Sequence, residues 1–188
     1  DGGGSDSGHV RVYQHREYTQ NDEDNNIYHY GSVEQGVTNL KPLIITGNNA
    51  VAPMVGNSYW TQLGWDINGK TVNDHGHFGR SIAMSNDGTR IAIGSIDIRG
   101  TGSTTASVGY VRVYDYRVYT QNDKNKDTYH YRTSSSIYRP LISTPNTSTA
   151  PVVGNSYWSQ VGSDIDGQLN DYLGHSVAMN SSGTRIVI

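Results

Sequence analysis

The stretch SIAMSNDGTRIAIG, residues 81–94, decides the fold. Apolar side chains recur at every second position before and after its centre, at Ile82 and Met84 and again at Ile91 and Ile93. This spacing is typical of β-strands, whose side chains alternate between two faces. The Asp-Gly pair between the two runs supplies the positive φ that a tight hairpin needs. The stretch therefore predicts an antiparallel hairpin with strands at residues 81–85 and 90–94.

The same hairpin sequence occurs twice, and so do the segments around it. SNDGTRI (85–91) is matched by NSSGTRI (180–186), and GHVRVY (8–13) by GYVRVY (109–114). Three further segments recur in the same order: YTQND at 18–22 and 119–123, YHY at 28–30 and 129–131, and NSYW at 57–60 and 155–158. Ordered matches of this kind indicate two tandem copies of one repeat. The spacing between matches changes within residues 30–41 and 69–79, which we expect to be loops.

Alternation of apolar and polar residues predicts four strands in each copy. After the hairpin, alternation predicts a third strand at residues 109–116 and a fourth at 157–161. Without its insert, each unit has the length of a propeller blade, about 40–50 residues, whereas solenoid repeats are shorter. We therefore predict an all-β fold of two four-stranded antiparallel β-propeller-like blades, each with a long hairpin insertion. Unit 1 is residues 1–108, a circularly shifted blade with its insert at about 14–58, and unit 2 is residues 109–188, with its insert at about 115–156.

The phase of the repeats favours a fragment of a longer repeat protein. A blade buries its faces against neighbouring blades of the same chain, and propellers usually have about 4–8 of them. The inserts are predicted to begin with a protruding hairpin: arms 17–20 and 27–30 around a tip at 21–26, and arms 118–121 and 128–131 in the second copy. Short strands are expected at 41–45 and 139–142.

Composition narrows the function. The net charge is only −3, which argues against a nucleic-acid partner, because such proteins need a basic stripe to neutralise phosphates. No run of about 18 apolar residues is present, so no membrane insertion is predicted. The 22 glycines fit a chain with many tight turns, and the lack of cysteine does not distinguish a secreted protein from a cytosolic one.

Three motifs carry a family resemblance: FGRSIAM (78–84), DGTRIAIG (87–94) and GYVRVY (109–114). In this order they resemble the FG-GAP repeat of integrin-like β-propellers and of microbial surface repeat proteins. The resemblance implies a propeller fold, an extracellular or cell-surface location, and adhesion. It does not carry over the calcium site of that family, because the hairpin loops NDG (86–88) and SSG (181–183) offer too few oxygen ligands for Ca²⁺.

Acidic clusters provide candidate metal ligands. Residues 22–26 and 123–127 match the opening of a calcium loop but lack its glycine and its closing glutamate, which favours a solvated hairpin tip over a metal site. D-x-[DN]-G at 66–69 and 164–167 is either an oxygen-rich pocket or a turn. No cofactor is predicted, and Ca²⁺ is the one ion considered. The candidates are Asp66, Asn68, Asp164, Asp166, Asp22, Asp24, Asp123 and Asp127.

Aromatic residues provide a candidate partner surface. Tyr28 with Tyr30, and Tyr129 with Tyr131, would each lie on one face of an arm, where they could stack on sugars or anchor a protein. The alternative is that they hold the arms together. Trp60 and Trp158 are expected to pack between blades.

No catalytic motif is present, and the H-x-H pair His75 and His77 is not reproduced in the second copy. We therefore predict a non-catalytic extracellular module for adhesion, protein or glycan binding, or scaffolding, with its ligand unidentified. The alternative is a fragment of a propeller hydrolase or lyase whose active site lies mostly on missing blades.

Overall fold

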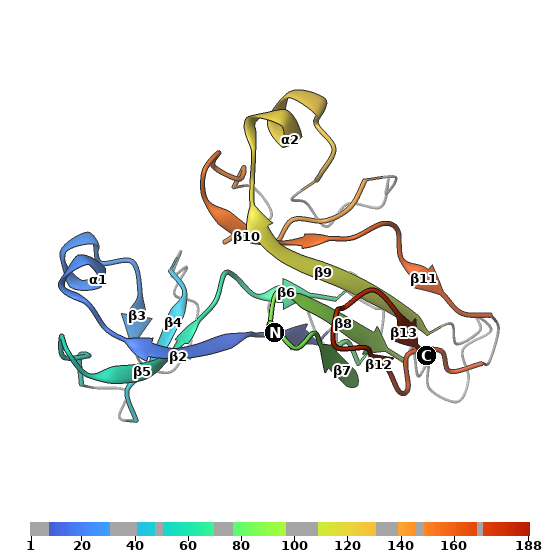
Figure 1. Cartoon of the computed structure of the whole chain (residues 1–188), viewed down its shortest axis with the longest axis horizontal. Coiled ribbons are helices and arrows are strands. Elements are labelled where there is room, and N and C mark those ends of the chain that lie inside the picture. The colour runs from blue at the N-terminus through green and yellow to red at the C-terminus, as the bar shows by residue number, and fades with distance from the viewer. Residues whose placement is uncertain are drawn as a thin grey trace, which may run out of the picture. The chain divides into compact units, whose positions relative to one another are not determined.

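The computed structural model describes residues 8–30, 41–47, 51–69, 77–96, 109–130, 139–145, 149–168 and 171–188. Thirteen strands and two six-residue helices are formed there, so the predicted all-β class is confirmed. The sheets are open, with two to five strands each (Figure 1).

Contacts group the chain into two units. One is Arg11–Trp65, and the other combines Asp1–Val10 with Asp66–Ile188. These contact units do not correspond to the predicted repeat units, 1–108 and 109–188. The boundary between the repeats after residue 108 stays a prediction.

The larger unit is built on a four-stranded antiparallel meander. Its strands are β7 (Ser81–Met84), β8 (Arg90–Ser95), β9 (Tyr110–Val118) and β10 (Ser156–Gln160), in the sheet order β10-β9-β8-β7. These are the four strands that the alternation predicts. The short β11 (Ile165–Asp166) pairs with the start of β9, opposite Val111 and Tyr110.

The core of this sheet combines the apolar positions of β8 with residues of β9 that alternate with its valines, whereas Ile82 and Met84 of β7 are 49% and 42% exposed. Ile91 and Ile93 on β8 lie opposite Tyr114 and Arg112 on β9, and all four are at most 1% exposed. Trp158 on β10 lies opposite Tyr116 and is fully buried.

The β7–β8 turn forms as its sequence predicts. Gly88 has φ +72°, and the Asp87 carboxylate accepts hydrogen bonds from the Ser85 hydroxyl (2.6 Å) and the Thr89 amide (3.1 Å). The repeated sequence forms a second hairpin, β12 (Ala178–Met179) and β13 (Ile186–Val187), with Gly183 at φ +67°. The two hairpins touch, since Arg90 donates a hydrogen bond to the Gly183 carbonyl (2.9 Å).

The larger unit also contains a two-stranded pair, β1 (His9–Val10) with β6 (Ile67–Asn68). The smaller unit has a sheet in the order β2-β5-β4-β3, formed by β2 (Tyr13–Glu17), β5 (Ser58–Gln62), β4 (Leu43–Ile45) and β3 (His29–Tyr30). β4 confirms the short strand predicted at 41–45. In the second copy, Leu141 and Ile142 form isolated bridges with His130 and Ser159.

The predicted hairpin insertions are wrong. The segments predicted as hairpin tips are the helices α1 (Gln20–Asn25) and α2 (Gln121–Lys126). The returning arm β3 pairs in parallel with β4 rather than with the outgoing arm. The physical reason is local: a threonine and an aspartate close a capping box at the start of each helix, which satisfies amides that a hairpin would pair across its two arms.

Candidate ligand-binding surface

Each copy carries a short helix on an arm that extends from its sheet. We name residues 16–30 ridge 1 and residues 117–130 ridge 2. In Figure 1, α1 follows β2, and α2 stands beyond the end of β9, away from the rest of that strand's sheet. A six-residue helix is too short to be stable by itself, so each ridge depends on side-chain contacts for its shape.

The first such contact is a capping box. In ridge 1 the Thr19 hydroxyl accepts from the Asp22 amide (3.3 Å), and the Asp22 carboxylate accepts from the Thr19 amide (2.9 Å). The helix ends at Asn26, which is left-handed with φ 45°. Ridge 2 repeats this arrangement with Thr120, Asp123 and Asp127, the last at φ 46°.

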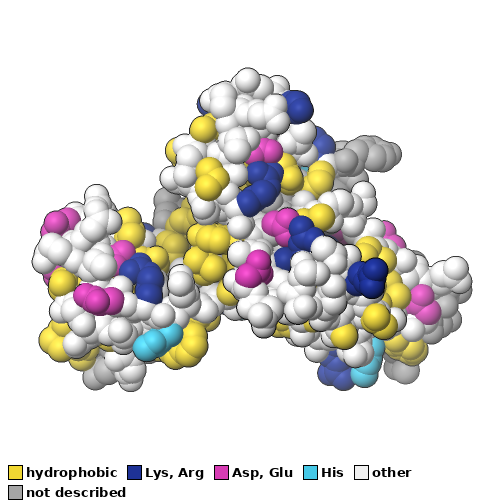
Figure 2. Space-filling view, viewed as in Figure 1, with side chains coloured by type: hydrophobic (Ala, Val, Ile, Leu, Met, Phe, Trp, Pro, Cys, Tyr) yellow, Lys and Arg dark blue, Asp and Glu magenta, His cyan; other side chains and the backbone are white. Residues whose placement is uncertain are grey.

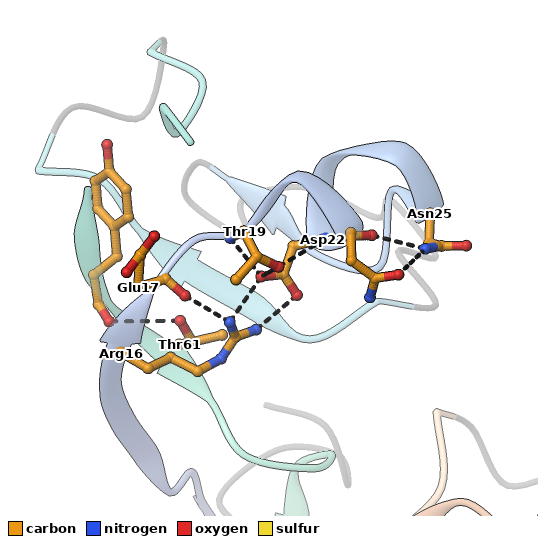
Figure 3. A network of polar contacts seen from close by, with 8 residues as sticks. Arg16, Glu17, Thr19, Asp22, Asn25 and Thr61 are labelled. Atoms are coloured by element: carbon orange, nitrogen blue, oxygen red, sulfur yellow. Dashed lines mark hydrogen bonds and ion pairs between the residues drawn. The ribbon is translucent and has the colours of Figure 1, made fainter. Parts of the chain in front are cut away.

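An arginine then fixes the capping aspartate. Arg16 donates from both terminal nitrogens to the two Asp22 oxygens, at 2.7 and 2.8 Å (Figure 3). The same guanidinium lies over the Tyr28 ring, 5.1 Å from its centroid. We name this set of arginine, threonine, aspartate and tyrosine the clasp.

Ridge 2 has the same clasp. Arg117 donates to both Asp123 oxygens at 2.8 and 3.0 Å and lies 4.9 Å from the centre of the Tyr129 ring. A bidentate charge-assisted pair is stronger and more directional than a neutral hydrogen bond, so the clasp holds each helix against its strand.

The clasp changes the acidity of its carboxylates. Hydrogen bonds from Arg16 lower the pKa of Asp22 to about 2, with further contributions from Thr19, although burial acts in the opposite direction. Hydrogen bonds from Arg117 lower the pKa of Asp123 well below its usual value. Both carboxylates are therefore ionised across the physiological pH range, and the clasp stays closed there.

A pair of tyrosines anchors the base of each ridge. Tyr18 meets Tyr59 of β5 edge to face, with ring centroids 6.4 Å apart, and the Tyr59 hydroxyl accepts from the Met54 amide (3.0 Å). In the second copy, Tyr119 and Tyr157 have the same separation of 6.4 Å. The base of the ridge, like its clasp, is thus the same in both copies.

The outward positions of the helices differ between the copies. Both ridges expose amide side chains, at Gln20 and Asn21 and at Gln121 and Asn122. Ridge 1 then exposes Glu23, Asp24 and Asn25, where ridge 2 exposes Lys124, Asn125 and Lys126. Two similarly built ridges therefore present opposite charge to solvent. On the face shown in Figure 2, Lys and Arg side chains lie close to Asp and Glu side chains in small groups.

The predicted metal ligands on the ridges have other partners in the structure. Asp22 and Asp123 belong to the clasps, and Asp127 is paired with Arg139. Asp24 is exposed and accepts from the Gln20 amide group (2.8 Å). Across the described ranges, no three His, Asp or Glu residues gather in a way that could hold a metal ion. Metal binding stays a prediction.

The second group of predicted ligands contains a buried ion pair. Arg112 donates to both Asp164 oxygens, at 2.7 and 3.0 Å, and Gln160 donates to the same carboxylate (2.8 Å). The other three candidates lie nearby or at the equivalent place: Asp166 on β11, Asn68 on β6, and Asp66, whose carbonyl accepts from Ser143 (2.8 Å). Sequence reasoning missed Arg112 as a buried partner of Asp164, because an arginine that alternates with valines is also the ordinary pattern of a half-exposed strand.

The predicted tyrosine surface is only partly available. Tyr28 and Tyr129 are covered by clasp arginines, and Tyr30 is 45% exposed. Tyr131 lies outside the described residues, as does His75 of the H-x-H pair. The tyrosine motif thus contributes to holding the ridge, and Tyr30 adds an aromatic ring to its open side.

Comparisons with models of protein families, with curated proteins and with solved structures found no match. None of the helices in the described part of the chain is long and apolar enough to cross a membrane.

Proposed function

We propose that this chain is a non-catalytic, extracellular β-propeller repeat module that binds a protein or glycan ligand through its two ridges. The observation that carries the proposal is the contrast within each ridge. The clasp residues are the same in both copies, whereas the exposed positions change from acidic to basic.

The repeated frame supports the propeller part of the proposal. The sequence copies have the order of an FG-GAP-like blade, and the larger unit contains a four-stranded antiparallel meander in chain order. A blade of this kind is a framework that repeats while its surface varies. Adhesion is the function that the FG-GAP resemblance implies for such a surface.

The rigid clasp supports the binding part. A surface that is ordered before a ligand arrives loses less conformational entropy on binding. Each ridge is held by a capping box, a bidentate ion pair and a tyrosine ring, and it exposes amide groups that can donate and accept hydrogen bonds. Such a ridge is suited to polar ligands such as glycans or loops of surface proteins.

Exchange of the two surfaces tests the proposal. One variant gives ridge 1 the exposed residues of ridge 2, as Glu23→Lys, Asp24→Asn and Asn25→Lys. The matched variant does the reverse, as Lys124→Glu, Asn125→Asp and Lys126→Asn. Neither replaces a clasp residue, so both variants are expected to keep the fold of the parent.

The parent and both variants are screened on arrays of glycans and extracellular proteins. We expect the parent to bind a defined subset and each exchange to change that subset. Identical binding patterns for all three proteins, or no binding by the parent, would reject the ridges as the ligand surface.

A further inference from the structure

The two ridges differ in the charge that their internal ion pairs leave over. Ridge 1 contains one arginine and four acidic residues, and the arginine is bound to Asp22. Glu17, Glu23 and Asp24 are exposed. The last two accept hydrogen bonds from the neutral side-chain amide of Gln20, at 2.9 and 2.8 Å. Ridge 1 therefore presents negative charge that no basic side chain pairs with in the part of the chain that the structure describes.

Ridge 2 leaves positive charge over instead. Its clasp arginine is bound to one of its two aspartates, and Arg139 is bound to the other, Asp127. Lys124 and Lys126 are both exposed, and among the described residues neither forms an ion pair. Both acidic groups of this ridge are thus neutralised by arginines, while its two lysines are open to a partner.

These charges stand at equivalent places on two helices of the same length. Glu23 of ridge 1 corresponds to Lys124 of ridge 2. In both ridges the glutamine at the start of the helix donates to the side chain four residues later, to Asp24 at 2.8 Å and to Asn125 at 2.6 Å. Because the capping box, the clasp and this hydrogen bond recur, the two exposed faces share a frame and carry opposite charge.

We propose that ridge 1 of one copy of this chain binds ridge 2 of a second copy, so that adhesion by this module is homophilic. The inference rests on the proposed function, because it names one ligand of the ridges. The chain itself supplies the partner: the charge exposed by each ridge is complemented by the other, and the exposed amides of both can donate and accept hydrogen bonds. Every copy carries both surfaces, so the contact is heterologous and joins copies into open chains or closed rings.

The contact between two single copies is weak. Exposed ion pairs contribute little in water, and a helix of six residues offers a small contact area. Adhesion does not depend on strong single contacts, because copies held on one surface bind many partners at once. Avidity then exceeds the single affinity by about 10²–10⁴-fold. The test therefore needs a method that detects weak complexes and reports which residues form them.

A nitroxide label on one copy detects such a contact through the amide signals of another. The chain has no cysteine, so Asn122→Cys places a single label on ridge 2. This chain is mixed with ¹⁵N-labelled parent that carries no nitroxide. We expect the amide signals of residues 20–26 to lose intensity selectively, relative to those of the β7–β8 hairpin. The selective loss should disappear at about 1 M salt, where the Debye length is about 3 Å.

A second label position is the control for random collisions. Ser163 is exposed and lies outside both ridges, so the label on Ser163→Cys should cause no selective loss at residues 20–26. Equal losses from the two label positions would overturn the proposed contact.

The two exchanges described above test whether charge causes the contact. When the ¹⁵N chain carries the ridge 1 exchange, which includes Glu23→Lys, two basic ridges face each other and the selective loss should vanish. It should return when the labelled chain also carries the ridge 2 exchange, which includes Lys124→Glu. Each exchange thus fails against an unchanged partner and succeeds against the other exchange, a pattern that misfolding of either variant cannot produce.

Failure of the paired exchanges to restore the selective loss would refute the homophilic contact. The array screen tests the ridges against other molecules and does not depend on this contact. A changed array pattern without any selective nitroxide effect would overturn the homophilic contact alone and keep the ridges as a surface for other ligands, so the two failures are distinguishable.

Discussion

The guanidinium of Arg112 and the carboxylate of Asp164 form a bidentate ion pair, 2.7 and 3.0 Å long, in which the arginine side chain is 1% exposed. Arg112 lies on β9, and Asp164 lies in the segment before β11, 52 residues later in the sequence. A buried charge is tolerated only when a partner and further hydrogen bonds replace its hydration. This pair therefore stabilises the connection between the two segments.

Removal of the Asp164 carboxylate is expected to destabilise the protein strongly. Asp164→Ala leaves Arg112 buried without its counter-charge, which should lower the free energy of unfolding by about 3–5 kcal/mol. Urea denaturation measures this loss. Arg112→Met combined with Asp164→Leu removes both charges and should recover most of it; a double variant as unstable as Asp164→Ala would contradict the explanation.

Replacement of the clasp arginine should change the acidity of its partner. Arg16→Lys keeps the charge but loses the planar bidentate geometry, so the pKa of Asp22 should rise from about 2 toward its ordinary value of 3.8. NMR titration of the carboxyl carbon measures this change. Arg117→Lys is the matched control, because it should raise the pKa of Asp123 and leave that of Asp22 unchanged.

The two clasps also predict how stability depends on pH. Asp22 and Asp123 have pKa values in the folded state below their ordinary value of 3.8. Their contribution is therefore complete above about pH 4 and is lost as the pH falls through the folded values, which is near pH 2 for Asp22.

Thermal unfolding between pH 6 and pH 2 measures this dependence. Replacing both residues, as Asp22→Asn with Asp123→Asn, should lower the melting temperature at pH 6 and flatten its decline below about pH 4. A variant whose melting temperature declines as steeply as that of the parent would show that other groups cause the acid sensitivity.

The backbone at Gly174 lies so close to Gly94 that we expect Gly94 to tolerate no larger residue. A Cβ atom at Gly94 would lie 2.2 Å from the Gly174 carbonyl oxygen. Gly94→Ala should therefore destabilise the larger unit by about 1–3 kcal/mol through overpacking. Gly162→Ala is the control, because open space surrounds the added Cβ atom. Since the φ of Gly162 is +70°, this substitution should destabilise the protein only through the strain of the left-handed conformation, by about 1–2 kcal/mol. The comparison is made by chemical denaturation of both variants.

The strands of the meander could be predicted because their signal is local. Ile82, Met84, Ile91 and Ile93 alternate across a turn whose glycine has the positive φ that its sequence indicates. The helices of the ridges were missed because their residues are polar throughout and lack a helical apolar period. The signal that could have found them was the capping pattern from Thr19 to Asp22, repeated from Thr120 to Asp123.

The sequence by itself determined the two copies, the strands of each and the positions of their turns, since alternation and glycine conformation act between near neighbours. Only the tertiary structure decided which of the equivalent residues are covered. Trp60 and Trp158 stand in the same sequence, NSYW, yet one is 53% exposed and the other fully buried. Arg112 likewise finds Asp164 only through folding. Burial and ion pairing depend on which distant segments pack against a residue, and that packing is not specified by the residue's neighbours in the chain.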